Sequence, residues 1–194
     1  VDLHLPSIRL IRQQLDAGKM GAPGLIRSHH WKPPSETGSV AAQLRMLVHT
    51  ELRLAIEFMG AAPNCVFALA TAESSQGADR QIHLGFPHGG MALITVSQRV
   101  PPGDAYRSFS LIGSSGAAYQ DDHPNRQLLF RGGRAAAVPS SEGGCAHAAM
   151  LQEFADQIGT PRKADDSIRR FRDVLNVADA VEESIRTRSA WRPE

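Results

Sequence analysis

The sequence predicts a single α+β domain: an open, largely antiparallel β-sheet with helices packed on one face. Three observations lead to this fold class. Amphipathic helical patterns lie at the two ends of the chain, short apolar runs lie between them, and glycine and proline separate those runs. The 194 residues can bury one good core and are few for two full domains. Residues 1–194 are therefore expected to form one domain.

The chain opens with a helix, a strand and a loop. The stretch LPSIRLIRQQLDAGKMG (5–21) predicts a helix, because Pro6 suits an early helical position and apolar residues follow at helical spacing. After a GAPG turn, GLIRSHHW (24–31) alternates as a strand does, and the Pro/Ser/Gly-rich stretch 32–39 predicts a loop.

The stretch LRMLVHTELRLAIEFMG (44–60) predicts a second, amphipathic helix that Gly60 closes. Apolar residues at steps of three and four form one stripe, which faces the core: Leu44, Val48, Leu52, Ala55 and Met59. Arg45, His49 and Arg53 form a second stripe beside it. Three side chains that can carry positive charge therefore lie one turn apart on this helix.

Seven short apolar runs between Pro63 and Pro139 predict strands, and turn signals such as PHGG, PPGD and GSSG separate them. Their close spacing favours an antiparallel meander over βαβ crossovers. Two helices are expected to follow, over 147–159 and 164–188.

The strands predict that both faces of the sheet are covered. In NCVFALATA and GMALITVSQRV both alternating sets of residues are largely apolar, whereas the predicted helices suffice for about one face. We therefore expect a homodimer or larger homo-oligomer built through the other face.

Composition excludes several classes of partner. The formal net charge of +1 provides no general electrostatic attraction for nucleic acid or an anionic membrane surface. The two cysteines are too few for a disulfide framework, which favours a reducing compartment. No membrane-length apolar run and no leader-like start are present, so a cytoplasmic location is expected.

The common cofactor and metal motifs are missing from the sequence. It contains no GxGxxG or GxxxxGK[ST] turn for phosphates, no HExxH, no CxxC and no GxSxG elbow. His29 and His30 are adjacent on a strand and point to opposite faces, which makes joint ligation of a metal awkward. We expect no cofactor-binding or metal-binding residues in this chain.

The run IRQQLDAGKMGAPGLIRSHHW resembles the start of the C-terminal domain of Gfo/Idh/MocA-type oxidoreductases, which include glucose–fructose oxidoreductase and inositol dehydrogenases. The resemblance continues through the glycine-closed helix at Gly60, SFSLIGSSGAAYQDD, LQEFADQIG and VADAVEESIRT, and it covers essentially the whole chain.

This resemblance implies the second of the family's two domains alone. The N-terminal Rossmann domain, which holds NAD or NADP in a full-length relative, and the lysine of the family's E-K-P segment would both lie upstream of Val1. The implied function is that of a substrate-binding and oligomerisation domain for an oxidoreductase acting on a sugar, cyclitol or related hydroxy compound. The alternative is a Rossmann-less or degenerate relative that binds a small ligand or acts as a scaffold without redox chemistry.

The family's D-x-x-x-H motif corresponds to Arg45 and His49, so the catalytic histidine is retained and the aspartate is replaced by arginine. A guanidinium beside the histidine favours neutral imidazole, whereas a carboxylate would stabilise imidazolium. A further family aspartate is matched by Leu52, and an alternative register places Thr50 in the position of the histidine.

The charged stripe therefore has two interpretations. In the functional one, Arg45 and His49 line a pocket for a small polyol or carboxylate and Arg53 extends it, because guanidinium suits bidentate recognition. In the structural one the stripe is a solvated flank on which Arg53 pairs with Glu57 one turn on.

Overall fold

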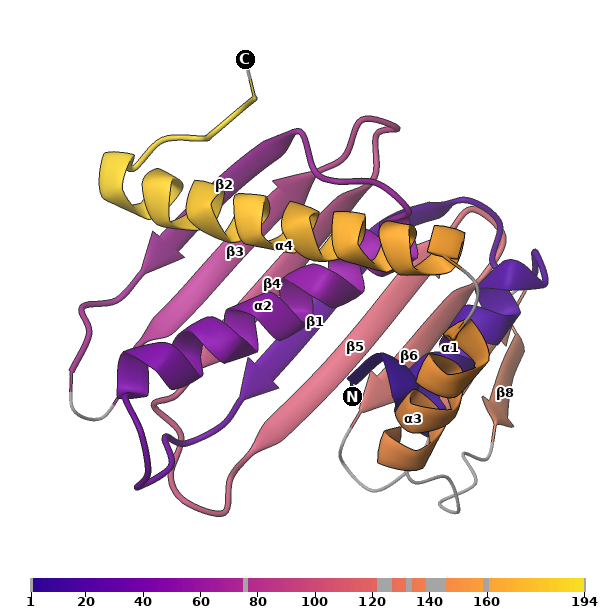
Figure 1. The fold of residues 1–194 in the computed structure, drawn as a ribbon, viewed down its shortest axis with the longest axis horizontal. Coiled ribbons are helices and arrows are strands. Elements are labelled where there is room, and N and C mark those ends of the chain that lie inside the picture. The colour runs from indigo at the N-terminus through magenta and orange to yellow at the C-terminus, as the bar shows by residue number, and fades with distance from the viewer. Residues whose placement is uncertain are drawn as a thin grey trace.

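The structure is a computed structural model that describes residues 2–74, 77–121, 127–131, 134–138, 146–158 and 161–193. The described part of the chain forms one eight-stranded sheet, four α-helices and a short 3-10 helix (Figure 1). The elements are η1 (Asp2–His4), α1 (Pro6–Asp16), β1 (Pro23–Trp31), α2 (Val40–Met59), β2 (Cys65–Ala70), β3 (Asp79–Gly85), β4 (Met91–Ser97), β5 (Tyr106–Gly113), β6 (Ala117–Asp121), β7 (Gln127–Arg131), β8 (Arg134–Val138), α3 (Ala146–Gln157) and α4 (Pro161–Thr187).

The sheet is open and largely antiparallel, as predicted, with the strand order β2-β3-β4-β1-β5-β6-β7-β8. The predicted meander is interrupted at one place. β1 lies between β4 and β5, parallel to β4 and antiparallel to β5, so that Ile26 is opposite Ala92 on one side and Leu111 on the other. The chain leaves β1 through α2, the residues that follow α2 lead to β2 at the edge of the sheet, and β2, β3 and β4 then lead back to β1. The residues between β4 and β5 predict a turn. This local signal does not show that β1 lies between the two strands.

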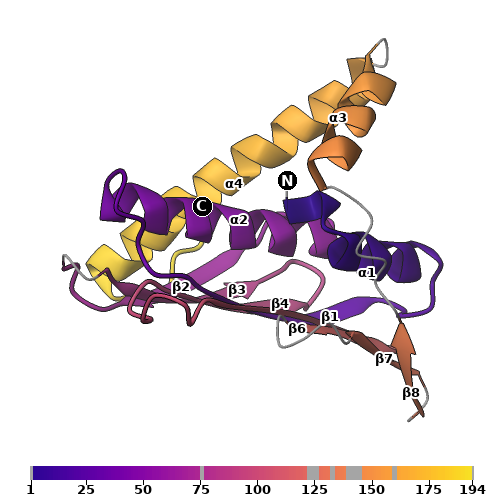
Figure 2. The same cartoon turned by 90° about the horizontal axis from the view of Figure 1, so that it is seen from below.

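All the helices lie on one face of the sheet (Figure 2). α2 runs across the centre, α4 lies over β2 and beside α2, and α1 lies toward β6. The predicted apolar stripe of α2 is confirmed, because each of its five members is at most 5% exposed. It packs against inward side chains of the sheet, among them Ile26, Ile82, Ile94 and Leu111.

The ends of α2 follow from the sequence. Ser39 caps its N-terminus, where the hydroxyl accepts a hydrogen bond from the Ala42 N–H at 3.4 Å. Gly60 closes its C-terminus in the left-handed region, with φ of 71°. The helix therefore begins four residues before the predicted stretch and ends where the sequence predicts.

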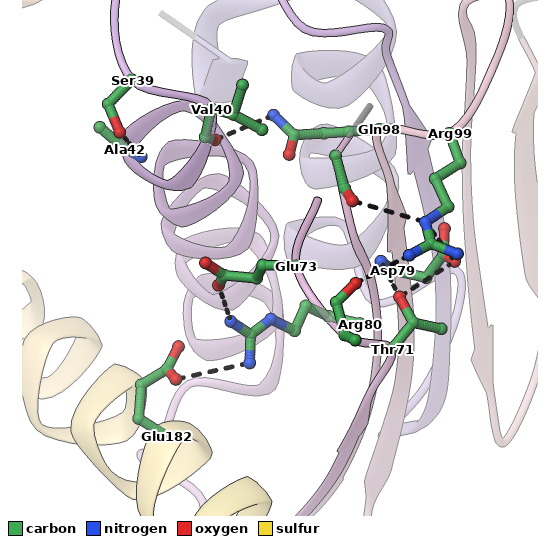
Figure 3. Close-up of polar contacts among 12 residues, drawn as sticks. Ser39, Val40, Ala42, Thr71, Glu73, Asp79, Arg80, Gln98, Arg99 and Glu182 are labelled. Atoms are coloured by element: carbon green, nitrogen blue, oxygen red, sulfur yellow. Dashed lines mark hydrogen bonds and ion pairs between the residues drawn. The ribbon is translucent and has the colours of Figure 1, made fainter. Parts of the chain in front are cut away.

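Polar contacts fasten the helices to β3 and to the residue that follows β4 (Figure 3). Arg80 of β3 is buried and lies between Glu73, at 2.9 Å, and Glu182 of α4, at 3.4 Å. The Gln98 amide donates to the carbonyl of Val40 in the first turn of α2 at 3.2 Å. These contacts fix α2 and α4 over the same end of the sheet.

None of the described helices covers the other face of the sheet (Figure 2). The strand register places an apolar row across this face, in which Met91, Leu25, Ile112 and Ala117 are neighbours on β4, β1, β5 and β6. An aromatic cluster lies on the same face at the other end of β1, where the rings of Trp31 and Tyr106 are 5.1 Å apart. We call this uncovered side the open face.

Within the described residues, no helix combines the length and the apolar character needed to cross a bilayer.

Candidate functional site

The solvent side of α2 lines a cavity that contains two of the three predicted site residues. The cavity has a volume of about 190 Å³ and lies between η1, α2 and α4. His49 and Arg53 line it together with Met46 and Thr50, and Phe171 of α4 forms the opposite side. Arg45 is exposed and is not among the lining residues. The structure thus brings His49 and Arg53 together in one cavity and leaves Arg45 outside it.

Two larger cavities adjoin the first. One, of about 330 Å³, lies between η1, α1 and α2, and the other, of about 570 Å³, extends to α3 and the first turns of α4. Leu3 and Arg53 line all three cavities. We refer to the three together as the helix cleft.

The ion pairs in the helix cleft differ from the Arg53–Glu57 pair that the structural interpretation of the charged stripe predicts. Glu57 does not pair with Arg53. Its carboxylate instead contacts Arg170 of α4 and lies 3.8 Å from Arg12 of α1. The guanidinium group of Arg53 makes no ion pair or hydrogen bond with the described residues, and the side chain is exposed in the cleft. Arg53 is therefore available to a ligand.

His4 of η1 lines the cavity of about 330 Å³ and contacts α3. Its ring nitrogen lies 3.4 Å from the Glu153 carboxylate of α3. Burial lowers the pKa of His4, Glu153 opposes this shift, and Arg53 and Arg9 add to the lowering. Burial is the largest of these causes, and Glu153 acts on the His4 pKa more strongly than either arginine does.

A buried polar network lies on the opposite side of α2, between the helix and the sheet. Glu51 is 1% exposed and accepts hydrogen bonds from Ser28 of β1 and from Arg107 of β5, the latter at 2.9 Å. His30 Nδ1 is 2.8 Å from the same carboxylate. Arg107 also donates to Asp2 of η1 at 2.6 Å. The network ties the start of the chain to the sheet beneath the helix cleft.

The charges of this network stabilise one another. Burial by itself would lower the pKa of Arg107, but Glu51 and Asp2 outweigh burial and the pKa is raised. For Asp2 the signs are reversed. Burial by itself would raise the pKa of this carboxyl, but the nearby Arg107 favours the charged form and the pKa is lowered. The network was not predicted from the sequence, although one signal was present: Glu51 occupies a position on the apolar face of the helix, where a carboxylate needs buried partners.

Neither register of the D-x-x-x-H motif supplies a carboxylate to the cavity. In the first register the aspartate position is Arg45, and in the alternative register it is Met46, with Thr50 in the histidine position. His49 and Thr50 both line the cavity. Asp2 is the one carboxylate among the lining residues, and it is engaged by Arg107.

The described residues contain no group of three or more His, Cys, Asp and Glu side chains placed to hold a metal ion. Cys65 is a free thiol, and Cys145 lies outside the described residues. The site is thus built from His49, Thr50 and guanidinium groups, which bind and orient oxygen-rich or anionic ligands.

No protein-family model and no curated protein sequence matches the chain. Solved structures do. UDP-N-acetylglucosamine 3-dehydrogenase from Acidithiobacillus ferrooxidans aligns with 95% of this chain and 59% of its own, at 23% identity and a TM-score of 0.79. An NAD-binding oxidoreductase from Klebsiella pneumoniae aligns with 98% of this chain and 64% of its own, at 15% identity and a TM-score of 0.75.

Levoglucosan dehydrogenase, solved with NADH and L-sorbose, aligns over the full length of this chain and 64% of its own, at 14% identity and a TM-score of 0.74. This chain therefore spans about three fifths of the length of these structures. At such identities the comparisons establish a shared fold. The predicted resemblance is confirmed at that level: the chain has the fold of the corresponding part of Gfo/Idh/MocA-type oxidoreductases.

Proposed function

We propose that this chain is the substrate-binding and oligomerisation domain of an NAD(P)-dependent oxidoreductase that acts on a sugar, cyclitol or related hydroxy compound. One observation carries the proposal: in a domain with the fold of sugar dehydrogenases, the solvent side of α2 lines a cavity with His49 and Arg53. The structural neighbours are longer than this chain, so the nicotinamide is expected on a separate cofactor-binding domain.

The proposed chemistry divides between that domain and the helix cleft. A nicotinamide held by that domain would accept the hydride of a hydroxyl-bearing carbon, and a base of this chain would take the hydroxyl proton. His49 is the proposed base, since neutral imidazole accepts a proton. Arg53 and Thr50 would orient the substrate oxygens through hydrogen bonds.

The second candidate is a relative that binds a sugar without redox chemistry. It is favoured by the missing carboxylate, because neither Arg45 nor Met46 can support a histidine as aspartate does. The two candidates share the ligand site and differ only in whether a hydride is transferred.

Ligand-observed saturation-transfer NMR tests the shared site. The ligands are UDP-N-acetylglucosamine, levoglucosan and L-sorbose, which the names of the structural neighbours supply. We expect saturation transfer to at least one of them, at millimolar or better affinity. His49→Ala should weaken binding, whereas His88→Ala, an exposed histidine after β3, should not. Absence of transfer to all three ligands would overturn the proposal.

A calorimetric titration with NADH separates the domain assignment from the ligand site. Since the chain lacks a phosphate-binding glycine turn, we expect no heat at millimolar NADH. A micromolar NADH site would contradict the assignment of cofactor binding to another domain.

A further inference from the structure

Two arginines on one side of the helix cleft have side chains without a polar partner among the described residues. Arg9 of α1 and Arg53 of α2 are both exposed, and both line the 570 Å³ and 330 Å³ cavities. Neither guanidinium group makes an ion pair or hydrogen bond within the described part of the chain, whereas that of the nearby Arg12 pairs with Asp16 at 2.9 Å. Two guanidinium groups therefore face the same space with their donors unused.

The nearby carboxylates are committed elsewhere. Glu57 is held by Arg170 and Arg12, and Asp166 by Arg169 at 2.9 Å. No acid of the cleft is within ion-pair distance of Arg9 or Arg53, in the part of the structure that is described. An anion that enters the cleft would not have to displace an existing salt bridge to reach them.

The opposite side of the cleft belongs to α3 and offers acceptors. Glu153 and Asp156 line the cavity, and glutamines of the same helix hold both carboxylates: Gln157 donates to Glu153 at 3.0 Å and Gln152 to Asp156 at 2.8 Å. Each carboxylate has further lone pairs that can accept hydroxyl hydrogens. The cleft thus has donors for an anion on one side and acceptors for hydroxyl groups on the other.

The orientation of α3 supports a polar ligand in the cleft. Its polar residues line the cavity, while Leu151, Phe154 and Ile158 on its apolar stripe are 61%, 66% and 71% exposed. A helix that turns its polar face toward its own domain gains little from apolar burial there. Its acceptors are instead placed to meet a ligand.

We propose that the helix cleft binds a phosphorylated sugar, with the phosphate on Arg9 and Arg53 and the sugar hydroxyls on Glu153 and Asp156. This deepens, and rests on, the proposed function, because it names the substrate class of the helix cleft, in which the cavity that holds these contacts shares Leu3 and Arg53 with the cavity of His49. The cavity of about 570 Å³ is of the size that holds such ligands. Phosphate is well matched to paired guanidinium groups.

Calorimetry at low salt with N-acetylglucosamine, N-acetylglucosamine 1-phosphate and inorganic phosphate tests the proposal. We expect the phosphorylated sugar to bind at least about tenfold more tightly than the neutral sugar, and its affinity to fall with added salt. Equal affinities for the two sugars would overturn the proposal.

Matched variants locate the phosphate. Arg9→Gln should weaken binding of N-acetylglucosamine 1-phosphate about fivefold or more and leave binding of the neutral sugar unchanged. Arg53→Gln should weaken binding of the phosphorylated sugar by at least the same factor, and binding of the neutral sugar by a smaller factor, because Arg53 also orients the sugar oxygens. Arg45→Gln removes an exposed arginine of α2 outside the cleft and should change neither. An equal effect of Arg45→Gln would show a diffuse charge effect and contradict the site, as would unchanged binding in the Arg9 and Arg53 variants.

The three ligands distinguish a failure of the phosphate site from a failure of the proposed sugar-binding function. Binding of the neutral sugar without any gain from phosphate refutes the phosphate site and leaves the proposed function standing. Phosphate binding that depends on Arg9 and Arg53, with no preference for a sugar, supports the anion site and refutes the sugar-binding function. No binding of any ligand refutes both.

Discussion

His49 is the residue on which the assignment of the site depends most. It is partly buried, lines the cavity, and its imidazole makes no hydrogen bond within the described part of the structure. His49→Ala should therefore change the free energy of unfolding by no more than about 0.5 kcal/mol, measured by urea denaturation. A loss of about 1 to 3 kcal/mol would show that His49 is a structural residue with a partner, and the pocket interpretation would fall.

Arg107 should be far more important for stability. Arg107→Met removes the cation between Glu51 and Asp2 and leaves the Glu51 carboxylate buried without it. We expect a loss of about 3 to 5 kcal/mol in the free energy of unfolding. The matched control is Arg27→Met, an exposed arginine of the neighbouring strand β1, which should cost less than about 1 kcal/mol.

Replacing Glu51 as well should restore part of the stability. The double variant Arg107→Met, Glu51→Leu removes the unpaired buried charge and is expected to be more stable than Arg107→Met alone. If the single variant loses less than about 1 kcal/mol, the network does not stabilise the fold.

The contrast between these residues explains what the sequence could and could not predict at this scale. The apolar stripe of α2 was predictable because helical spacing is a local property. The partners of Glu51 were not, because Ser28, His30 and Arg107 come from strands 21 to 56 positions away and only the sheet register brings them together. For the same reason the pairing of Glu57 with Arg170, 113 positions away, replaced the local pair with Arg53.

At the scale of elements, α3 is the α-helix of the described structure that contains no buried residue. Its principal neighbours are η1 and α4. Its amides should exchange with solvent at least about two orders of magnitude faster than those of the buried helix α2, as measured by hydrogen exchange. A bound phosphorylated sugar should slow exchange in α3 and leave that of the β3–β4 hairpin unchanged. Equal protection of α3 and α2 without ligand would contradict this account of α3.

The predicted elements were found because each depends on local pattern, but their spatial order was only partly predictable. All seven strands predicted after Pro63, and β1 before them, are present. The place of β1 between β4 and β5 depends on how α2 crosses the sheet, and nothing local to either strand encodes it. Periodicity and turn chemistry therefore determined the elements, and long-range packing determined their neighbours.

At the scale of the whole molecule, the open face remains to be covered. Its apolar row of Met91, Leu25, Ile112 and Ala117 predicts a homodimer through the sheet. Light scattering at about 50 µM should show a dimer or larger assembly, because an interface of about 800 Å² per subunit is stable at such concentrations.

Two lysine substitutions test which surface associates. Leu25→Lys, on the open face, should convert the assembly to monomer. Leu151→Lys, on the exposed stripe of α3, should leave it intact. A monomeric parent chain would contradict the prediction, and dissociation by Leu151→Lys alone would move the interface to α3.

The central claim is that the helix cleft is the ligand site of this domain, and a map of amide chemical-shift changes tests it most directly. In a titration with UDP-N-acetylglucosamine, the largest ¹H–¹⁵N shifts are predicted in η1, in the first turns of α1, around His49 and Arg53 of α2, and in α3. Strands β2, β3 and β4 should change little. No shifts at 10 mM ligand, or shifts centred on the open face, would contradict the claim.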